Sequence, residues 1–446
     1  MFEERDNSFF TGTEYTTNVV LKPEELDLLQ ELLHHRVMLS RTVHDFIQTR
    51  TKNGRHANGI SNRLRRLVDA GVLNRLKENV SATRAPVYRY YYKLAKRGLL
   101  ILVDEGKLTL EEAEKFYNQI KSRRIPKIHN LATSILVNDI YLKVLKEGIK
   151  GYSHSRGVDD TRLNGEEPIP ADRKGLVLPD WVFTLNKRTV CLEVDTGTET
   201  SRVVEAKVER YIKFAESIQG SGEDLAIVFS VVDPSLNLPT YRFSIDRTKR
   251  ISSLKASIPP IQSWPSNLSV YVITAEKTDE LLLRLLKREE PYSKDLRQLV
   301  IFEWMERLKI YKDSDIHLKE FDNGYLNELE ILKELEPDGV IELTRGRRKD
   351  RLALIWGEEG SIATYQLIRA NQFKTRKGRE SKSPLDGVLA IYPNKNQLDS
   401  DIYGEPWENV WLTDFATWQK IENREDPFPM FMKIVSNYRK EWMPYE

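Results

Sequence analysis

The stretch Ile60-Ser61-Asn62-Arg63-Leu64-Arg65-Arg66-Leu67-Val68 decides the fold of the N-terminal part of the chain. Its apolar residues recur every three or four positions, so on a helix they form one stripe. Gly71 follows soon after, as is typical of a helix C-terminus. The pattern predicts a helix over residues 57–70 that packs through the stripe and offers its polar side chains to DNA, as a recognition helix does.

Two more helices are predicted upstream of this one. Leucines at helical spacing fill residues 21–33, where Pro23 and the acidic residues after it suit a first helical turn. A second helix is expected to begin at Ser40, because serine is a favourable N-cap residue. A polar turn over residues 51–58 then leads to the third helix. Three helices in this order favour a helix-turn-helix domain.

A β-hairpin is predicted after the third helix. It consists of a strand at 73–77, a polar tip at 78–86 and a tyrosine-rich strand at 87–94. Such a hairpin is the wing of a winged-helix domain, which we place at residues 1–105. DNA contacts are expected from Asn62, Arg63, Arg65 and Arg66 of the third helix, from Arg55 before it, and from Arg75, Lys77, Arg84 and Arg89 of the wing. A winged helix used only for protein contacts is the alternative.

The distribution of charge supports a nucleic-acid interface in this domain. Between Arg36 and Arg97 there are 15 Lys and Arg residues against 3 Asp and Glu residues, a local excess of +12. Since the whole chain carries only +2, the remainder carries −10. A positive charge concentrated in one small domain is the electrostatic pattern of a protein that binds phosphates. We therefore expect double-stranded DNA as the partner.

Composition excludes several other classes of protein. A chain of 446 residues suits two or three domains. It has no apolar run of the length that crosses a membrane, and its start lacks a secretory signal, so we expect a cytoplasmic protein without a membrane partner. Its one cysteine, Cys191, excludes an internal disulfide and a cysteine-based zinc site. The chain also lacks the glycine-rich phosphate loops, so no nucleotide cofactor is expected.

A second domain is predicted to follow a helical linker at residues 106–127 and to cover residues 128–290. A long amphipathic helix over 129–146 begins it. Two apolar runs, 178–185 and 189–195, are separated by a short polar turn and predict a β-hairpin.

Three carboxylates accompany this hairpin. Alternation along a strand places Leu192 and Val194 on the core face, with Glu193 and Asp195 together on the opposite face. Asp180, near the start of the preceding strand, can supply a third oxygen ligand, and three such ligands suit Mg²⁺ or Mn²⁺. The helix expected over 201–215 carries Lys207 and should pack across the hairpin.

The middle of the chain resembles the plasmid-type replication-relaxation proteins, which join a winged helix to a degenerate PD-(D/E)xK nuclease-like core. The resemblance covers roughly residues 20–235, and the matching residues are Pro179-Asp180, Glu193-Val194-Asp195, Gly197 and Lys207-Val208-Glu209-Arg210-Tyr211. In the wider superfamily the second motif ends in lysine, whereas this chain has Asp195 there. The resemblance therefore implies that Lys207 reaches the site from the next helix, with Glu193, Asp195 and Lys207 as catalytic residues.

The C-terminal third, residues 291–446, repeats the order of elements in the second domain. Glu336-Pro337-Asp338 and the apolar run at 352–356 answer Pro179-Asp180 and the strand at 189–195. In this alignment Ile355 stands in the place of Glu193, and Gly357 in the place of Asp195. We expect a degenerate second nuclease-like copy without an active site, and so an α/β multidomain protein.

These observations predict an accessory DNA-binding protein of a plasmid or other mobile element that controls replication or mobilisation, with a homodimer expected. An active core would make it a Mg²⁺-dependent endonuclease or nickase. Two alternatives stay open at this point. One is a non-catalytic transcriptional regulator that uses the nuclease-like domains for dimerisation or DNA clamping, and the other is a restriction or transposon-end endonuclease.

Overall fold

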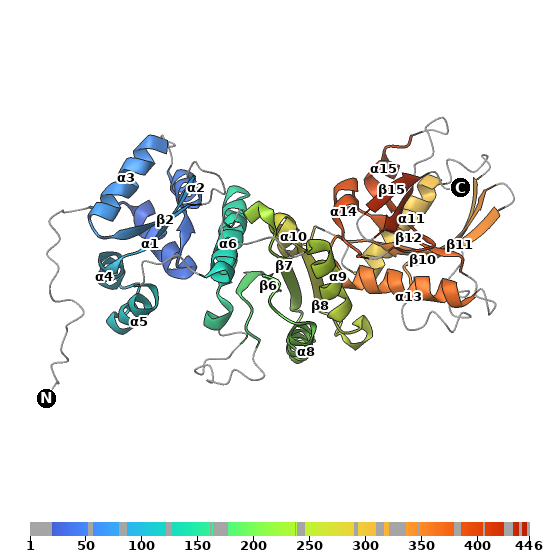
Figure 1. Ribbon diagram of the computed structural model, residues 1–446, viewed down its shortest axis with the longest axis horizontal. Coiled ribbons are helices and arrows are strands. Elements are labelled where there is room, and N and C mark those ends of the chain that lie inside the picture. The colour runs from blue at the N-terminus through green and yellow to red at the C-terminus, as the bar shows by residue number, and fades with distance from the viewer. Residues whose placement is uncertain are drawn as a thin grey trace. The chain divides into compact units, whose positions relative to one another are not determined.

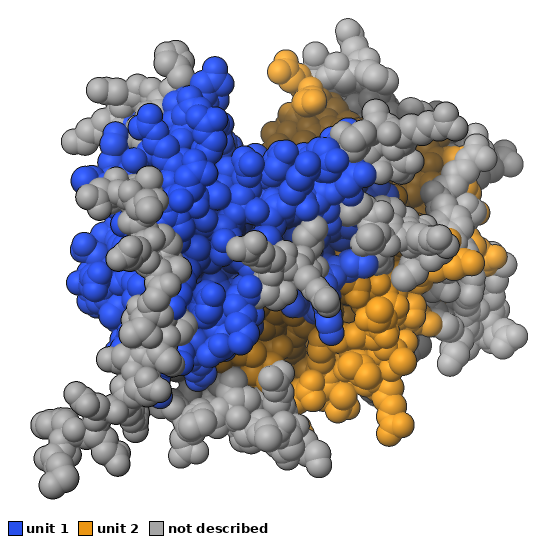
Figure 2. Space-filling view, turned by 60° about the vertical axis from the view of Figure 1, so that its left-hand side comes forward, with its two compact units in different colours: residues 1–156, 234–242 blue, residues 157–233, 243–446 orange. Residues whose placement is uncertain are grey.

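The structure is a computed structural model, and its chain divides into two compact units. Unit 1 comprises residues 1–156 and 234–242, and unit 2 comprises residues 157–233 and 243–446. Figure 2 colours them separately. The structure describes residues 20–51, 57–79, 87–121, 127–160, 163, 177–236, 238, 246–289, 293–308, 316–320, 336–345, 348–378, 385–404, 406–422, 431–436 and 439–443. Each unit mixes helices with a sheet, so the prediction of an α/β multidomain protein is confirmed at this level.

Unit 1 contains a three-stranded antiparallel sheet and six helices among its described residues (Figure 1). Its elements in chain order are α1 (Pro23–His35), β1 (Met38–Leu39), α2 (Ser40–Arg50), α3 (Ala57–Asp69), β2 (Leu73–Asn79), β3 (Tyr88–Leu94), α4 (Lys96–Asp104), α5 (Leu110–Ile120), α6 (Ile128–Lys146) and β4 (Tyr152–Ser155). The strand order in the sheet is β1-β3-β2. The three predicted helices and the hairpin therefore exist, whereas β1 was not expected because two residues leave no periodic pattern.

The apolar stripe of α3 determines how this helix packs. Ile60, Leu64 and Leu67 are buried to 1% exposure or less and join one core with residues of α1, α2 and β2. Gly71 follows the helix with a positive φ of 68°, a conformation that glycine adopts without a Cβ clash. The opposite side of α3 is left exposed, as the sequence pattern predicts.

Helix α6 belongs to unit 1, although the sequence places it at the start of the second domain. Its side chains are buried almost all round rather than along one face, so the prediction of an amphipathic helix is wrong. Tyr141 joins the core of α1 and α2. The described unit 2 begins at Gly157, whereas the predicted domain begins at residue 128. A helix that is apolar on every face does not reveal in its sequence which neighbour it packs against.

The first half of unit 2 is a sheet in which β5, β6, β7 and β8 lie in this order. Its described elements are β5 (Trp181–Leu185), β6 (Arg188–Asp195), α8 (Ser201–Ser217), β7 (Asp224–Val231), α9 (Arg247–Ser257), β8 (Leu268–Thr274) and α10 (Ala275–Lys287). Strands β5 and β6 are antiparallel and joined by a tight turn in which Asn186 has a positive φ of 55°. Strands β6, β7 and β8 are parallel.

Helices cover both faces of this sheet. Helices α8 and α9 pack on one face, and α10 packs on the other, where Thr278 and Ser230 share a hydrogen bond of 2.7 Å. Glu193 and Asp195 do share a face, but it is the buried face beneath α8 and α9 rather than a solvent face. The two acidic residues therefore lie together opposite Leu192 and Val194, as predicted. Both faces are buried, because a parallel sheet is covered by its crossover helices on both sides.

The second half of unit 2 holds a seven-stranded sheet in the order β15-β14-β13-β12-β11-β10-β9. Its described elements are α11 (Lys294–Leu308), β9 (Ile316–Glu320), β10 (Gly339–Arg345), β11 (Arg348–Trp356), α13 (Ile362–Gly378), β12 (Gly387–Tyr392), α14 (Lys395–Ser400), β13 (Val410–Asp414), α15 (Phe415–Gln419), β14 (Phe431–Ser436) and β15 (Arg439–Met443). Alternate residues of β11 enter two cores, one with α11 and α15 and the other with α13.

The two halves of unit 2 have the same local topology. In each, an antiparallel pair (β5–β6, β10–β11) is followed by two parallel strands (β7–β8, β12–β13), with a long helix crossing over after the second strand. The pairing registers agree as well. Trp181 and Gly339 each directly follow the aspartate of a Pro-Asp pair, and they pair with Leu192 and Leu354 respectively. This is the correspondence that the sequence alignment predicts.

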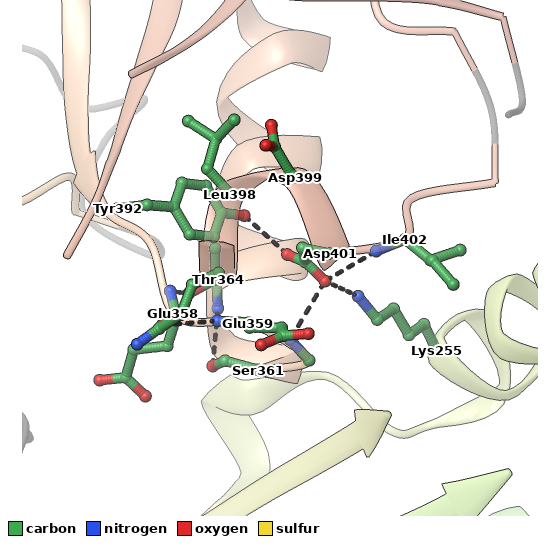
Figure 3. A network of polar contacts seen from close by, with 12 residues as sticks. Lys255, Glu358, Glu359, Ser361, Thr364, Tyr392, Leu398, Asp399, Asp401 and Ile402 are labelled. Atoms are coloured by element: carbon green, nitrogen blue, oxygen red, sulfur yellow. Dashed lines mark hydrogen bonds and ion pairs between the residues drawn. The ribbon is translucent and has the colours of Figure 1, made fainter. Parts of the chain in front are cut away.

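A buried polar network joins these two halves (Figure 3). Asp401 accepts hydrogen bonds from Lys255 Nζ at 2.8 Å, from Tyr392 OH at 2.6 Å and from the backbone N–H of Gly360 at 3.1 Å. Lys255 lies on α9 and the other three residues lie in the second half. Lys255 and Asp401 are 1% and 3% exposed, so the contact is an ion pair inside the protein.

None of the helices that the structure describes is long and apolar enough to cross a membrane.

Candidate functional site

The β5–β6 hairpin places Asp180 beside β6. Asp180 directly precedes β5, and its Oδ2 accepts a hydrogen bond of 2.8 Å from the backbone N–H of Val194. This contact fixes the aspartate side chain against the neighbour of Glu193 on β6. The negative charge of Asp180 is close enough to Glu193 to affect the pKa of that residue.

Helix α8 completes the surroundings of Glu193. Lys207 Nζ lies 2.8 Å from Glu193 Oε2, and the hydroxyl of Tyr211 donates a hydrogen bond of 2.7 Å to Glu193 Oε1. Lys207 and Tyr211 are four residues apart and so share one face of the helix. Lys207 Nζ also lies 2.9 Å from Glu199 Oε1. The sequence predicts the approach of Lys207, whereas Glu199 was not singled out because it precedes the helix in a loop.

Burial controls the protonation of this cluster. Glu193 is 3% exposed, and its removal from water raises its pKa to about 7, assisted by the charge of Asp180 and opposed by Lys207 and Tyr211. Burial opposes ionisation of Lys207 as well, but the charges of Glu193 and Glu199 outweigh it and raise the pKa of Lys207 above its ordinary value. Lys207 therefore stays protonated at neutral pH, which suits stabilisation of negative charge rather than proton abstraction.

Asp195 has a different partner from the one predicted. The Arg250 guanidinium of α9 holds both of its oxygens, with Nε at 2.7 Å from Oδ2 and Nη2 at 2.6 Å from Oδ1. Asp180, Glu193 and Asp195 do not all bring their oxygens within 4.8 Å of one another, as ligands that share one ion would. The structure therefore brings Asp180, Glu193 and Lys207 together, and Asp195 pairs with Arg250. No spacing pattern pointed to Arg250, which is 55 residues away in sequence.

The second half of unit 2 keeps only part of this arrangement. Asp338 Oδ2 accepts a hydrogen bond of 2.8 Å from the backbone N–H of Trp356, the same contact that Asp180 makes with Val194. Ile355 then occupies the place of Glu193 and is fully buried. Asp338 pairs instead with Arg297 of α11, at 3.3 Å.

In unit 1 the exposed side of α3 presents part of the predicted DNA-contact set. Asn62, Arg65 and Arg66 are exposed, so they can reach a partner. Arg63 cannot, because its Nε and Nη2 each lie 2.7 Å from an oxygen of Glu25, a residue of α1 that is 0% exposed. Arg63 therefore holds α3 against α1. In the sequence, Arg63 could not be distinguished from Arg65 and Arg66, because all three are arginines on the polar side of the same helix.

The hairpin of unit 1 offers two further cations. Arg75 lies over the ring of Tyr90 at 5.0 Å, and Lys77 lies over the ring of Tyr88 at 3.6 Å from the centroid. Both are exposed on β2, and stacking on an aromatic ring fixes their direction. Arg89 differs, because its Nη1 donates to the backbone carbonyl of Leu236 at 3.1 Å. Of the other predicted contacts, Arg55 and Arg84 lie outside the described residues.

Comparisons with known proteins give one family and one structure. Among curated proteins no match is found. Among solved structures, the small subunit of a heterodimeric restriction endonuclease is similar at 13% identity over 44% of this chain and 89% of that chain, with a TM-score of 0.21. A TM-score this low carries no argument about fold or activity. The model of the family described as "Replication-relaxation" matches residues 29–226. The matched family is the one that the Pro-Asp, Glu-Val-Asp and Lys207 motifs predicted.

Proposed function

We propose that this protein binds double-stranded DNA through a winged helix in unit 1 and controls the replication or mobilisation of a plasmid or other mobile element. The family match over residues 29–226 supports the biological setting. The order of three helices and a hairpin, with a sheet order of β1-β3-β2, supports a winged helix. The excess of positive charge between Arg36 and Arg97 supports a polyanionic partner.

The exposed residues of unit 1 divide into two kinds of DNA contact. Asn62, Arg65 and Arg66 on α3 suit base edges in the major groove, because their side chains donate hydrogen bonds in a directed manner. Arg75 and Lys77 on the hairpin suit phosphates. Arg63 stabilises this DNA-contact surface indirectly, because its contact with Glu25 fixes α3 to α1.

The core of unit 2 is a candidate metal-dependent nuclease. The observation that carries this proposal is the contact of 2.8 Å between Lys207 and Glu193, because it supplies from α8 the lysine that the second motif lacks. Asp180 and Glu193 would hold Mg²⁺ or Mn²⁺, which at such a site polarises a phosphate and lowers the pKa of bound water. Lys207, protonated beside them, would stabilise the negative charge that develops on the phosphate. Asp195 holds Arg250 and α9 in place.

The deciding experiment is cleavage of supercoiled plasmid that carries the DNA upstream of the gene, in Mg²⁺, Mn²⁺ or EDTA. Wild-type protein is compared with Glu193→Gln and Lys207→Met. Matched controls on α8 are Glu205→Gln and Lys213→Met, which change exposed residues of the same types. We expect metal-dependent nicking or linearisation that is lost in the first pair and retained in the second. Intact plasmid in every lane, together with tight binding, would contradict the nuclease.

A regulator without catalysis is the second candidate function, and a specific observation favours it. Each carboxylate of β6 already has a protein partner, Glu193 in Lys207 and Asp195 in Arg250, as structural carboxylates do. Such a protein should bind its site equally well in EDTA and leave the DNA intact. A restriction or transposon-end endonuclease would instead cut plasmids that lack the upstream region.

The repeated topology of unit 2 suggests a duplicated nuclease-like core whose second copy lost its acidic residues. Ile355 and Gly357 stand where Glu193 and Asp195 stand in the first copy. A copy without catalysis suits bracing or dimerisation, in keeping with the homodimer expected from sequence. Analytical ultracentrifugation of the full chain, with and without DNA, tests the dimer.

A further inference from the structure

A cluster of two histidines and one glutamate lies in unit 1. Glu31 and His35 are on α1, and His154 is on β4. The Nε2 atoms of His35 and His154 each lie 3.7 Å from Glu31 Oε2, and one donor atom from each of the three residues lies within 4.8 Å of the others. Glu31 and His35 are four residues apart, so they share one helix face and point to the same place.

The spacing of these atoms fits an ion better than direct contacts. A separation of 3.7 Å is longer than a hydrogen bond between the same atoms. Two ligands of a tetrahedral Zn²⁺ ion at ~2.1 Å lie roughly 3.4 Å apart, so each separation between Glu31 and a histidine would shorten by only ~0.3 Å. Glu31 Oε2 is buried, and no hydrogen bond of ordinary length reaches it within the described part of the chain.

The surroundings also favour a metal ion. The ring of His35 is buried, and its centroid lies 5.0 Å from that of the His154 ring. The ring of Tyr152 stacks on His154 at 5.3 Å, and Tyr141 packs on the same ring at 5.3 Å.

We propose that Glu31, His35 and His154 bind a structural Zn²⁺ ion that fastens β4 to α1. Two imidazole nitrogens and one carboxylate oxygen form a ligand set that selects zinc over magnesium. The side chains of His35 and His154 are only 1% and 8% exposed, and that of Glu31 is 20% exposed, so a water molecule can complete the coordination from the Glu31 side. Helix α1 also contacts α3 through the pair of Glu25 and Arg63. An ion that stabilises α1 therefore also stabilises the position of α3.

The test is Zn²⁺ binding by the full-length protein after removal of metal with a chelator. Isothermal titration should give one tight site per chain in the wild type, and excess Mg²⁺ should not compete. Glu31→Gln and His154→Gln should each weaken Zn²⁺ binding by on the order of 100-fold or more, because loss of a ligand exceeds loss of an outer partner. His34→Gln, the exposed neighbour on α1, and Glu205→Gln, an exposed residue of α8 in unit 2, should bind as the wild type does.

A second measurement keeps the proposal testable if a variant folds poorly. Zn²⁺ should raise the melting temperature of the wild type, and Co²⁺ should give the visible absorption of a four-coordinate site with nitrogen ligands. Wild-type protein that binds no Zn²⁺ at micromolar concentration would overturn the proposal. Folded Glu31→Gln and His154→Gln variants that bind Zn²⁺ with wild-type affinity would overturn it equally.

Discussion

The guanidinium of Arg63 in α3 contacts both carboxylate oxygens of Glu25 in α1, at 2.7 Å each. Glu25 is 0% exposed, so this is a buried carboxylate paired with a guanidinium. The pair joins the first helix of unit 1 to the helix that we propose enters the major groove. Arg63, which the sequence predicts to contact DNA, therefore holds α3 in place.

Arg63→Ala should destabilise unit 1 by about 3–5 kcal/mol, because it removes the guanidinium that pairs with the buried carboxylate of Glu25. Urea denaturation followed by circular dichroism measures the loss. Arg66→Ala, which changes an exposed arginine of the same helix, should shift stability by no more than about 0.5 kcal/mol. Equal effects of the two substitutions would contradict the assignment of Arg63 to the fold.

Arg66→Ala should instead weaken DNA binding. Loss of one base contact costs about 1–3 kcal/mol and relaxes sequence preference at one position. Lys77→Ala on the hairpin should weaken binding to all sequences alike and lower the slope of log K against log salt by about one. Fluorescence anisotropy with specific and unrelated duplexes distinguishes the two patterns, with Lys213→Ala of unit 2 as the control. Binding unaffected by both substitutions would exclude this face of unit 1.

Mn²⁺ binding to unit 2 should depend on pH through Glu193. Because burial raises the pKa of Glu193 to about 7, its carboxyl is largely neutral at pH 6 and ionised at pH 8. A metal ion binds the ionised form, so affinity should fall by about tenfold for each pH unit below the pKa. Calorimetric titration at several pH values measures this, and Glu193→Gln should lose the dependence. An affinity that stays constant between pH 6 and 8 would show that Glu193 is not a ligand.

Glu359→Gln should stabilise unit 2 at alkaline pH. Burial, with the charge of Asp401, raises the pKa of Glu359 to about 7 from the ordinary 4.5. The folded state therefore holds a proton that the unfolded state releases, and this contribution is present in full below pH 4.5 and is lost as pH rises through 7. The variant should gain about 2–3 kcal/mol over the wild type at pH 8 and almost nothing at pH 4.5. Denaturation at both pH values, with the exposed Glu216→Gln as control, checks the sign.

Lys255→Met should loosen the junction between the two halves of unit 2. The substitution removes the cation 2.8 Å from Asp401 and leaves that carboxylate buried. The expected cost is about 3–5 kcal/mol. Lys249→Met, an exposed change on the same helix, should have little effect. If both variants melt like the wild type, the network in Figure 3 does not hold the halves together.

The sequence by itself determined the local elements and much of their order. Apolar spacing identified α1, α2, α3, β5, β6 and β11, because periods of 3.6 and 2 follow from backbone geometry alone. The Pro-Asp pairs and the strands after them also predicted the correspondence between Asp180 and Asp338. The sequence did not indicate which unit α6 packs in, because apolar residues surround this helix on all sides.

Only the tertiary structure decided which charged groups meet. Lys207 reaches Glu193 as the sequence suggested. Asp195, however, pairs with Arg250, which is 55 residues away in the chain, and Arg63 pairs with Glu25, which is 38 residues away. His154 likewise lies beside Glu31 and His35, although most of the sequence of unit 1 separates them. Residue type and periodicity fix which face of an element a side chain occupies. The partner on the other side depends on how distant elements pack, and no local pattern records that.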